Sequence, residues 1–212
     1  MPSLKDTEIQ IIEIVMPQHT NPLDTLHGGQ MMEWLVNVGT LAATRVAKGP
    51  VVLGAIDDVD FVNAVLANEI VVLEAQVHYI GTSSIEVGAR VTSEQPYTGI
   101  TKLTTSCHLS FVSVDAKGRP RPVSTNLNPN SKKEQGLFQA AKVRNQTRRS
   151  RLATQIVKEL SNITPRHRPQ FTTHSVRSVL PEDATHSDLM FGGRLLKHLD
   201  ELGAILCMRY SK

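Results

Sequence analysis

The sequence contains an internal repeat, which restricts its fold more than any other feature. Residues Val15–Val46 recur without a gap at Val179–Tyr210, at an offset of 164 positions. This offset places the pair Gly28-Gly29 on Gly192-Gly193, and it also aligns a proline, a leucine and an arginine. Such self-similarity predicts one structural unit followed by at least the start of a second.

The differences between the two copies are as informative as the matches. The second copy has Asp200 where the first has Val36, and the first copy has Thr25 where the second has Leu189. Each polar group is therefore kept in only one copy. This division predicts a site that the two copies share, with one residue contributed by each.

The first copy and the residues after it have the pattern of an α+β domain. Residues 7–16 are rich in isoleucine and valine and predict a strand, and apolar residues at helical spacing predict a helix over Gly28–Val46. Four further strand-like runs follow, at Val51–Phe61, Glu69–Ile80, Ser84–Val91 and Leu103–Val114. Consecutive strands joined by short turns predict an antiparallel sheet, here one curved sheet covering a single long helix.

Residues 116–169 are strongly basic, with 13 of the 23 lysines and arginines but only two acidic residues. A capping-box pattern at Ser131 and Glu134 predicts a helix over Lys132–Leu160. Its Arg144–Arg151 cluster is typical of a solvated helix face. A contact to a phosphate is the alternative, and the lack of interleaved aromatic residues disfavours nucleic-acid binding.

After this helix the sequence predicts a strand at Gln170–Leu180 and a helix at Gly192–Tyr210. These two elements repeat the first strand and the central helix of the first copy. The four strands that follow the first helix have no counterpart after Tyr210.

Composition excludes several classes of protein. No apolar run approaches the ~18–20 residues that a membrane-spanning helix needs, and the N-terminus lacks a signal-peptide pattern. Cys107 and Cys207 lie far apart, which predicts two thiols in a reducing compartment, the cytoplasm by default. The eight histidines show no metal-binding spacing, so we expect no metal.

The segment Asn21–Gly29, with the sequence NPLDTLHGG before a helix, resembles the loop of the hot-dog-fold acyl-CoA thioesterases. The second copy, Asp188–Ala204, is similar to the same signature and has Asp200 at the family's catalytic acid position. The strands resemble the family's sheet as well, at Asp57–Val62, His78–Val87 and Asp115–Val123.

This resemblance implies a hot-dog domain over residues 1–125, a basic linker with a helix over 126–170, and the start of a second hot-dog repeat over 171–212. Tandem members of the family hold acyl-CoA between two units, with a loop residue from one unit and an acid from the other. By that resemblance Asp200 is the general base or nucleophile and Thr25 orients it. The N–H of Gly29 or Gln30 at the helix start is then the oxyanion donor.

The same resemblance implies a set of substrate-binding residues: Asp24, His27, Gly28, Gly192, Gly193, Thr82, Ser83 and Ser84. For several of these a structural role is the alternative. The two glycine pairs would also allow close helix packing, His27 would also serve as a hydrogen-bonding loop residue, and Thr82–Ser84 would also form a plain turn.

We therefore expect an enzyme that hydrolyses acyl-CoA to a free acid and CoA. Its only coenzyme would be the CoA of the substrate, and the expected assembly is a homo-oligomer, a dimer or a hexamer. The missing strands keep open a second interpretation, a non-catalytic acyl-CoA-binding or assembly subunit, or a fragment of a longer protein. A hot-dog hydratase using Asp24 and His27 is a third, less favoured one.

Overall fold

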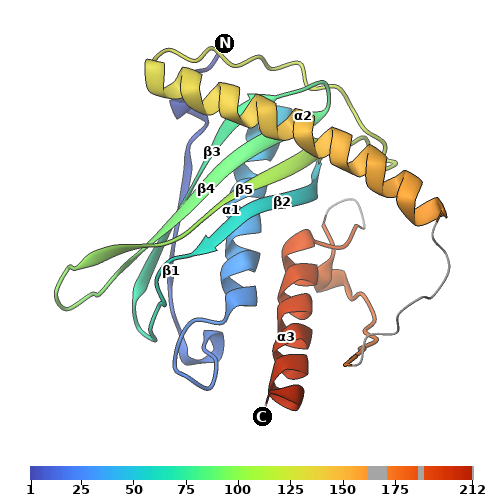
Figure 1. Cartoon of the computed structure of the whole chain (residues 1–212). Coiled ribbons are helices and arrows are strands. Elements are labelled where there is room, and N and C mark those ends of the chain that lie inside the picture. Colours follow the sequence, from blue (N-terminus) through green and yellow to red (C-terminus); the bar gives the residue numbers. More distant parts are fainter. Residues whose placement is uncertain (162–170, 186–188, 212) are drawn as a thin grey trace.

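The computed structural model describes residues 1–161, 171–185 and 189–211, and it has the hot-dog architecture. A five-stranded antiparallel sheet wraps around one long helix (Figure 1). The strands are β1 (Ile9–Ile14), β2 (Val51–Phe61), β3 (Ile70–Ile80), β4 (Ser84–Glu94) and β5 (Thr101–Ser113). The helices are α1 (Gly28–Ala47), α2 (Lys132–Ser161) and α3 (Gly192–Tyr210).

The sheet has the strand order β1-β3-β4-β5-β2. Strands β3, β4 and β5 follow one another as hairpins, as their short turns predict, whereas β1 and β2 flank them at the two edges. The α+β class, the central helix and the five strands expected in the first unit are confirmed. Each expected boundary of these elements lies within a few residues of the observed one.

The core lies between α1 and the concave face of the sheet. Leu35 and Val38 of α1 are fully buried, together with Leu109 and Phe111 of β5. Gly39 permits the close approach of helix and sheet, because a Cβ at this position would lie 2.5 Å from Leu109 Cδ1. The apolar stripe read from the sequence is therefore the face of α1 that packs on the sheet.

Helix α2 crosses the other face of the sheet (Figure 1). The guanidinium of Arg148 is buried there between two carboxylates: Nη1 lies 2.7 Å from Glu86 Oε1 and Nη2 lies 2.5 Å from Asp57 Oδ2. The solvated face expected for Arg144–Arg151 is thus wrong for Arg148, whose side chain is only 6 % exposed. The hydrogen bonds that Arg148 donates to Glu86 are the main cause that raises the pKa of Arg148 further above its ordinary value, so it stays charged.

Where the structure describes the second copy, over 179–185 and 189–210, its local structure matches that of the first. The 3₁₀ turns Pro17–His19 and Pro181–Asp183 occupy equivalent positions, and so do the bridges Thr20–Leu26 and Ala184–Met190. The strand expected at Gln170–Leu180 is wrong for residues 171–180, which are not in a strand; Gln170 lies outside the described residues. In the first copy β1 pairs with β3, and no strand in the described part of the second copy takes the place of β3. Within the described ranges, no helix is long and apolar enough to cross a membrane.

Candidate functional site

Helices α1 and α3 pack side by side and run in opposite directions (Figure 1). The contact depends on two glycines. A Cβ on Gly29 would lie 2.9 Å from Lys197 Cα, and a Cβ on Gly193 would lie 3.1 Å from Glu33 Cα. Because the offset of 164 relates Gly29 to Gly193 and Glu33 to Lys197, the two contacts are equivalent. The two copies therefore pack around an approximate two-fold axis.

Polar side chains fasten this helix pair. Lys197 Nζ donates to Gln30 Oε1 at 2.7 Å and lies 3.4 Å from Glu33 Oε2, whereas Arg194 Nε lies 3.1 Å from Glu33 Oε1. The pairs are partly exposed, so each contributes modestly to stability. Their main effect is to fix the register of α3 against the N-terminus of α1.

This register places Asp200 of α3 against the first residues of α1. The Gly29 N–H donates to Asp200 Oδ2 at 2.7 Å, and His27 Nδ1 lies 2.7 Å from the same oxygen. So short a nitrogen–oxygen distance requires a proton between the two atoms, so we assign the proton of His27 to Nδ1. Gly29 N also lies 3.3 Å from His27 Nδ1, but two N–H groups cannot bond each other, so Asp200 is the acceptor.

The other carboxylate oxygen of Asp200, Oδ1, is the one that can act on a water or a substrate. Oδ1 has no hydrogen bond to any residue that the structure describes, and the Asp200 side chain is 42 % exposed, which allows water to reach it. A Cβ on Gly28 would lie 3.3 Å from Oδ1, so the absence of a side chain there keeps this oxygen accessible. In the structure Asp200 thus lies against Gly28, Gly29 and His27, whose roles as site residues stay predictions.

The expectation for the oxyanion donors needs correction. The Gly29 N–H is bonded to Asp200, and the Gln30 N–H donates to His27 O at 3.1 Å. Gln30 is unsuitable because the first turn of its own helix uses its N–H. Gly29 is suitable only if the thioester oxygen replaces Asp200 Oδ2 as it gains negative charge, which the positive end of the α1 dipole stabilises.

On the other side of the two-fold axis, the residues equivalent to Asp200 and His27 are apolar. Val36 is fully buried there, and Phe191 replaces His27 before the start of α3 and packs on the core. A Cβ on Gly192 would lie 2.9 Å from Leu53 Cβ. Gly192 and Gly193 thus serve close packing in this structure. Val36 therefore cannot act as Asp200 does, although Glu13, Glu33 and Glu182 line a cavity beside Phe191.

Two further predicted site residues, Thr25 and Asp24, lie in the loop before α1. The Thr25 hydroxyl donates to Asn21 Oδ1 at 3.1 Å, and the same oxygen accepts the N–H of Leu23 and Thr25. Thr25 also lines a cavity of about 220 Å³ between this loop and the ends of β2 and β5. Asp24 is exposed and has a positive φ of 56°, which marks a turn residue. No hydrogen bond joins Thr25 or Asp24 to Asp200 in the described residues.

Thr82, Ser83 and Ser84 form the turn between β3 and β4. The carbonyl of Ser83 accepts the N–H of Ser113 at the end of β5, that of Thr82 accepts the N–H of Val123, and the Ser84 hydroxyl accepts from Asn145 Nδ2 at 3.1 Å. These bonds fasten the turn to α2 and to the exit segment. The structure therefore does not bring these three residues into contact with Asp200.

The described ranges contain no group of three histidine, cysteine, aspartate or glutamate side chains that could hold a metal ion. His27 and Asp200 alone provide two ligands, fewer than a stable protein site requires. The chemistry that this site offers is therefore that of a carboxylate, an imidazole and a helix N-terminus.

Comparisons with known proteins agree with this picture. The family described as "Thioesterase superfamily" matches residues 23–100. An uncharacterised acyl-CoA thioester hydrolase of Bacillus subtilis is 32 % identical over 147 residues, which are 69 % of this chain and 85 % of that protein. Acyl-coenzyme A thioesterase 11 of Mus musculus is 26 % identical, and the match spans 96 % of this chain but 36 % of that longer protein.

Solved structures of acyl-CoA thioesterases and hydrolases are also similar to this chain. An apo-hexameric acyl-CoA thioesterase aligns with a TM-score of 0.67 and 32 % identity, over 71 % of this chain and 96 % of its own. The acyl-CoA hydrolase of Staphylococcus aureus, solved with butyryl-CoA and CoA, aligns with a TM-score of 0.67 and 27 % identity, over 76 % of this chain and 98 % of its own. That hydrolase has also been solved with an asparagine, an aspartate or a threonine replaced by alanine.

Proposed function

Because this chain belongs to the acyl-CoA thioester hydrolases of the thioesterase superfamily, we propose that it hydrolyses acyl-CoA with Asp200 as the catalytic carboxylate. The observation that carries the proposal is the contact of Asp200, from the second copy, with the Gly29 N–H at the start of α1 in the first copy. Related hydrolases bind CoA and butyryl-CoA, which supports the substrate class.

The geometry suits hydrolysis of a thioester in a simple way. The helix N-terminus polarises the carbonyl, and Asp200 Oδ1 takes a proton from water as the water oxygen attacks the carbonyl carbon. The carbon–sulfur bond then breaks, and CoA leaves as a thiolate that is protonated by the resulting acid. Direct attack by Asp200 to form a mixed anhydride is the second route, and both routes require the same carboxylate. His27 holds Oδ2 and so orients the carboxylate.

Asn21 is a further candidate that sequence reasoning missed. In the Staphylococcus aureus hydrolase the replaced asparagine and aspartate stand 15 residues apart. The same spacing joins Asn21 to Val36 in the first copy, and Thr185 to Asp200 in the second. We therefore propose that Asn21 supplies the loop amide of the composite site, and that Thr25 acts by holding the Asn21 oxygen.

Two substitutions separate the roles of these loop residues. Asn21→Ala removes an amide that would contact the substrate or the attacking water, so kcat should fall by about 10-fold or more. Thr25→Ala leaves the amide present and loosens it, so the loss should be smaller. If Thr25→Ala proves more harmful than Asn21→Ala, the assignment of Asn21 is wrong and the original one of Thr25 stands.

The test of the function itself is hydrolysis of a panel of acyl-CoA chain lengths by this 212-residue chain. CoA release is followed by a thiol reagent, and binding is measured in parallel by calorimetry. Turnover of at least one chain length supports the proposal. Binding of acyl-CoA without turnover of any chain length would instead support the alternative, a non-catalytic binding subunit.

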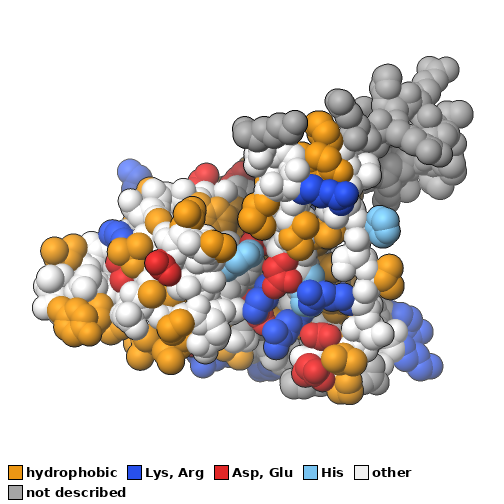
Figure 2. All heavy atoms as spheres, turned by 90° about the horizontal axis from the view of Figure 1, so that it is seen from below, with side chains coloured by type: hydrophobic (Ala, Val, Ile, Leu, Met, Phe, Trp, Pro, Cys, Tyr) orange, Lys and Arg blue, Asp and Glu red, His pale blue; other side chains and the backbone are white. Residues whose placement is uncertain are grey.

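Self-association is the second part of the proposal. Leu195 and Leu199 of α3 are 47 % and 53 % exposed, and Ile205 is 51 % exposed, so α3 presents an apolar face that the described residues do not cover. Other apolar side chains gather at the end of the molecule that holds the β4–β5 turn (Figure 2). A hexameric relative supports an oligomer, and analytical ultracentrifugation showing only monomer at micromolar concentration would contradict it.

We place the protein in the cytoplasm. Both cysteines are free thiols, Cys107 buried and Cys207 exposed, as a reducing compartment permits. Fluorescence microscopy of the tagged chain in its own cell would test this placement, and enrichment in an oxidising compartment would contradict it.

A further inference from the structure

Helix α3 has an apolar groove on a side other than the one that contacts α1. The groove has a volume of about 270 Å³ and lies between α3 and residues 175–179, which precede the 3₁₀ turn of the second copy. Three leucines of α3 line it, Leu195, Leu199 and Leu202. We call these residues the groove leucines.

The first copy shows what covers the equivalent side of its own helix. The offset of 164 relates Leu199 to Leu35 and Gly203 to Gly39. Leu35 is fully buried under the sheet, whereas Leu199 is 53 % exposed. A Cβ on Gly39 would lie 2.5 Å from Leu109 Cδ1 of the sheet, whereas a Cβ on Gly203 would meet no atom within 4 Å. This side of α3 therefore has the residues of a sheet-covered helix, and the described residues do not cover it.

Residues 173–178, which are equivalent to β1, lie against α3 as β1 lies against α1. Arg177 Nη1 is 3.0 Å from His198 Nδ1, and Nη2 donates to Glu201 Oε2 at 3.4 Å. In the first copy, one cavity is lined by the three equivalent residues, Glu13, Trp34 and Asn37. The second copy thus retains the position of β1 beside its helix, although these residues are not in a strand.

The strand that pairs with β1 has no counterpart in the described part of the second copy. In the first copy β3 pairs with every residue of β1, from Ile9 to Ile14. The backbone of residues 173–178 forms no hydrogen bond with any other described residue. A row of free N–H and C=O groups is a template for the addition of a strand. An acyl chain would fill the groove but would leave these groups unpaired.

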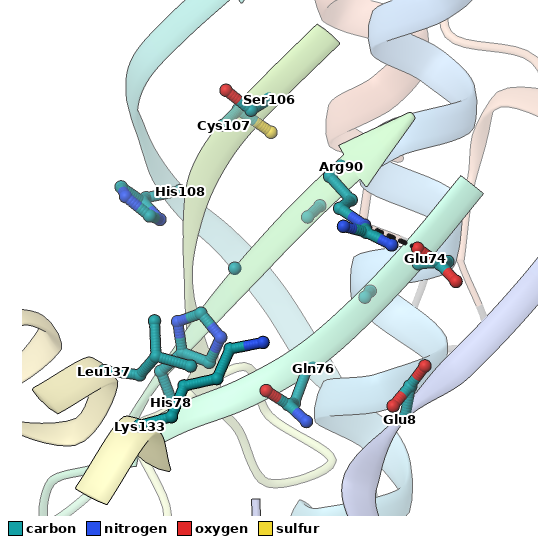
Figure 3. Close-up of a pocket in the computed structure, with 13 residues that line it drawn as sticks. Glu8, Glu74, Gln76, His78, Arg90, Ser106, Cys107, His108, Lys133 and Leu137 are labelled. Atoms are coloured by element: carbon teal, nitrogen blue, oxygen red, sulfur yellow. Dashed lines mark hydrogen bonds and ion pairs between the residues drawn. The ribbon is translucent and has the colours of Figure 1, made fainter. Parts of the chain in front are cut away.

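A second copy of the chain has no free concave sheet face to place over α3. That face is filled by α1, and α2 crosses the outer face. The outer face also has a cavity of about 380 Å³ under the start of α2, with charged side chains on its walls that include the ion pair of Arg90 with Glu74 (Figure 3). Neither of these surfaces suits the groove leucines.

We propose that the groove on α3 binds an extended polypeptide segment with apolar residues at alternate positions. Its backbone pairs with residues 173–178, and its apolar side chains cover the groove leucines. Strand β3 is the example in this molecule, since its alternate residues are buried against α1 while its backbone pairs with β1. Pairing of the backbone provides affinity, and the alternate side chains provide specificity. Asp200 lies on the side of α3 that contacts α1, so this binding does not depend on the proposed hydrolysis.

The test uses the full chain and a fluorescent synthetic peptide with the sequence of residues 69–80, which include β3. The control peptide has the same composition, but its apolar residues do not alternate. Fluorescence anisotropy should show saturable binding of the first peptide, about 10-fold or more tighter than binding of the control. Hydrogen exchange, followed by mass spectrometry, should become slower at residues 173–178 when the first peptide binds, because their amides become paired.

Two variants of the protein locate the contact. Leu199→Asp puts a charge among the groove leucines and should weaken binding of the peptide by about 10-fold or more. Met208→Asp makes a similar change at an apolar residue of α3 that is 66 % exposed and lies outside the groove, so it should leave binding unchanged. Should Leu199→Asp fail to fold, Ile205→Asp is the substitute, since Ile205 also lines the groove and is 51 % exposed.

Three results would overturn the proposal. The first is equal binding of the two peptides, which would mean unspecific adsorption to an apolar surface. The second is binding that leaves hydrogen exchange at residues 173–178 unchanged, because the strand would then not pair there. The third is a dimer that excludes the peptide and that Leu199→Asp dissociates in sedimentation, which would make a second copy the occupant of the groove.

Discussion

Substitution of Gly29 by alanine probes the contact on which the whole site depends. A Cβ at this position would lie 2.9 Å from Lys197 Cα and 3.0 Å from Asp200 Cβ. Carbon atoms in contact prefer a separation of about 3.5–4.0 Å, so α3 must move away from α1 by nearly 1 Å. The obstacle is largely the backbone of α3, which cannot rotate aside as the end of a long side chain could.

The consequence for the site follows from the size of that movement. The Gly29 N–H to Asp200 Oδ2 hydrogen bond, now 2.7 Å, would lengthen beyond 3.5 Å and be lost. A bond to a charged group contributes about 1.5–3 kcal/mol, at the lower end here because Asp200 is partly exposed. The helix propensity of alanine offsets up to about 1 kcal/mol of this. A 1 Å misplacement of a catalytic group lowers the rate by about 10²-fold.

The assay compares kcat on acyl-CoA and the melting temperature of three proteins: wild type, Gly29→Ala and Gly203→Ala. Gly203 is the control, since it lies on α3 and a Cβ there meets no atom within 4 Å. We expect Gly203→Ala to keep its activity and to melt at a slightly higher temperature. A Gly29→Ala protein with wild-type kcat would refute the close packing of α3 against the start of α1.

Three further predictions concern stability and reactivity. Arg148→Gln leaves the carboxylate of Glu86 buried without its charged partner, so we expect chemical denaturation to show a free energy of unfolding lower by about 3–5 kcal/mol; an unchanged value would contradict the buried ion pair. The pKa of His78 is about 4 in the folded chain against 6.5 in the unfolded one. The unfolded chain therefore binds more protons as the pH falls below 6.5, and His78 should lower stability by up to about 3 kcal/mol by pH 4; His78→Gln should remove this part of the loss and leave the part due to His108, whose pKa burial also lowers. Burial raises the pKa of Cys107 to about 12, so a thiol reagent should label Cys207 alone at pH 8 until the chain is unfolded.

Local periodicity was sufficient to predict most of the fold. The stripe that includes Leu35 and Val38 marks the buried face of α1, and the alternation around Val87 marks β4, because both patterns result from burial of one face. The strand expected at residues 171–180 failed for the opposite reason. A strand needs a hydrogen-bonding partner, and its own sequence does not say whether one is present.

The site was predictable only in part. The repeat showed that only the second copy has an acid at the position shared by Val36 and Asp200, and the structure places Asp200 against Gly28 and Gly29 of the first copy. The contact of His27 with Asp200 and the burial of Arg148 depend on how separate elements pack. The spacing of residues along the sequence does not predict such packing. The β-bulge at His78, which shifts the pairing of Tyr79 and Ile80 with β4, is likewise a matter of register between two strands.

The most direct test of the account is the turnover of acyl-CoA by Asp200→Asn. The amide keeps the size of the carboxylate but cannot take a proton, so kcat should fall by at least about 10²-fold while binding of acyl-CoA changes little. Asp24→Asn is the matched control in the loop and should have a much milder effect. Near wild-type turnover by Asp200→Asn, with activity abolished by Asp24→Asn or His27→Ala, would contradict a site shared by the two copies and would place the chemistry within the first unit alone.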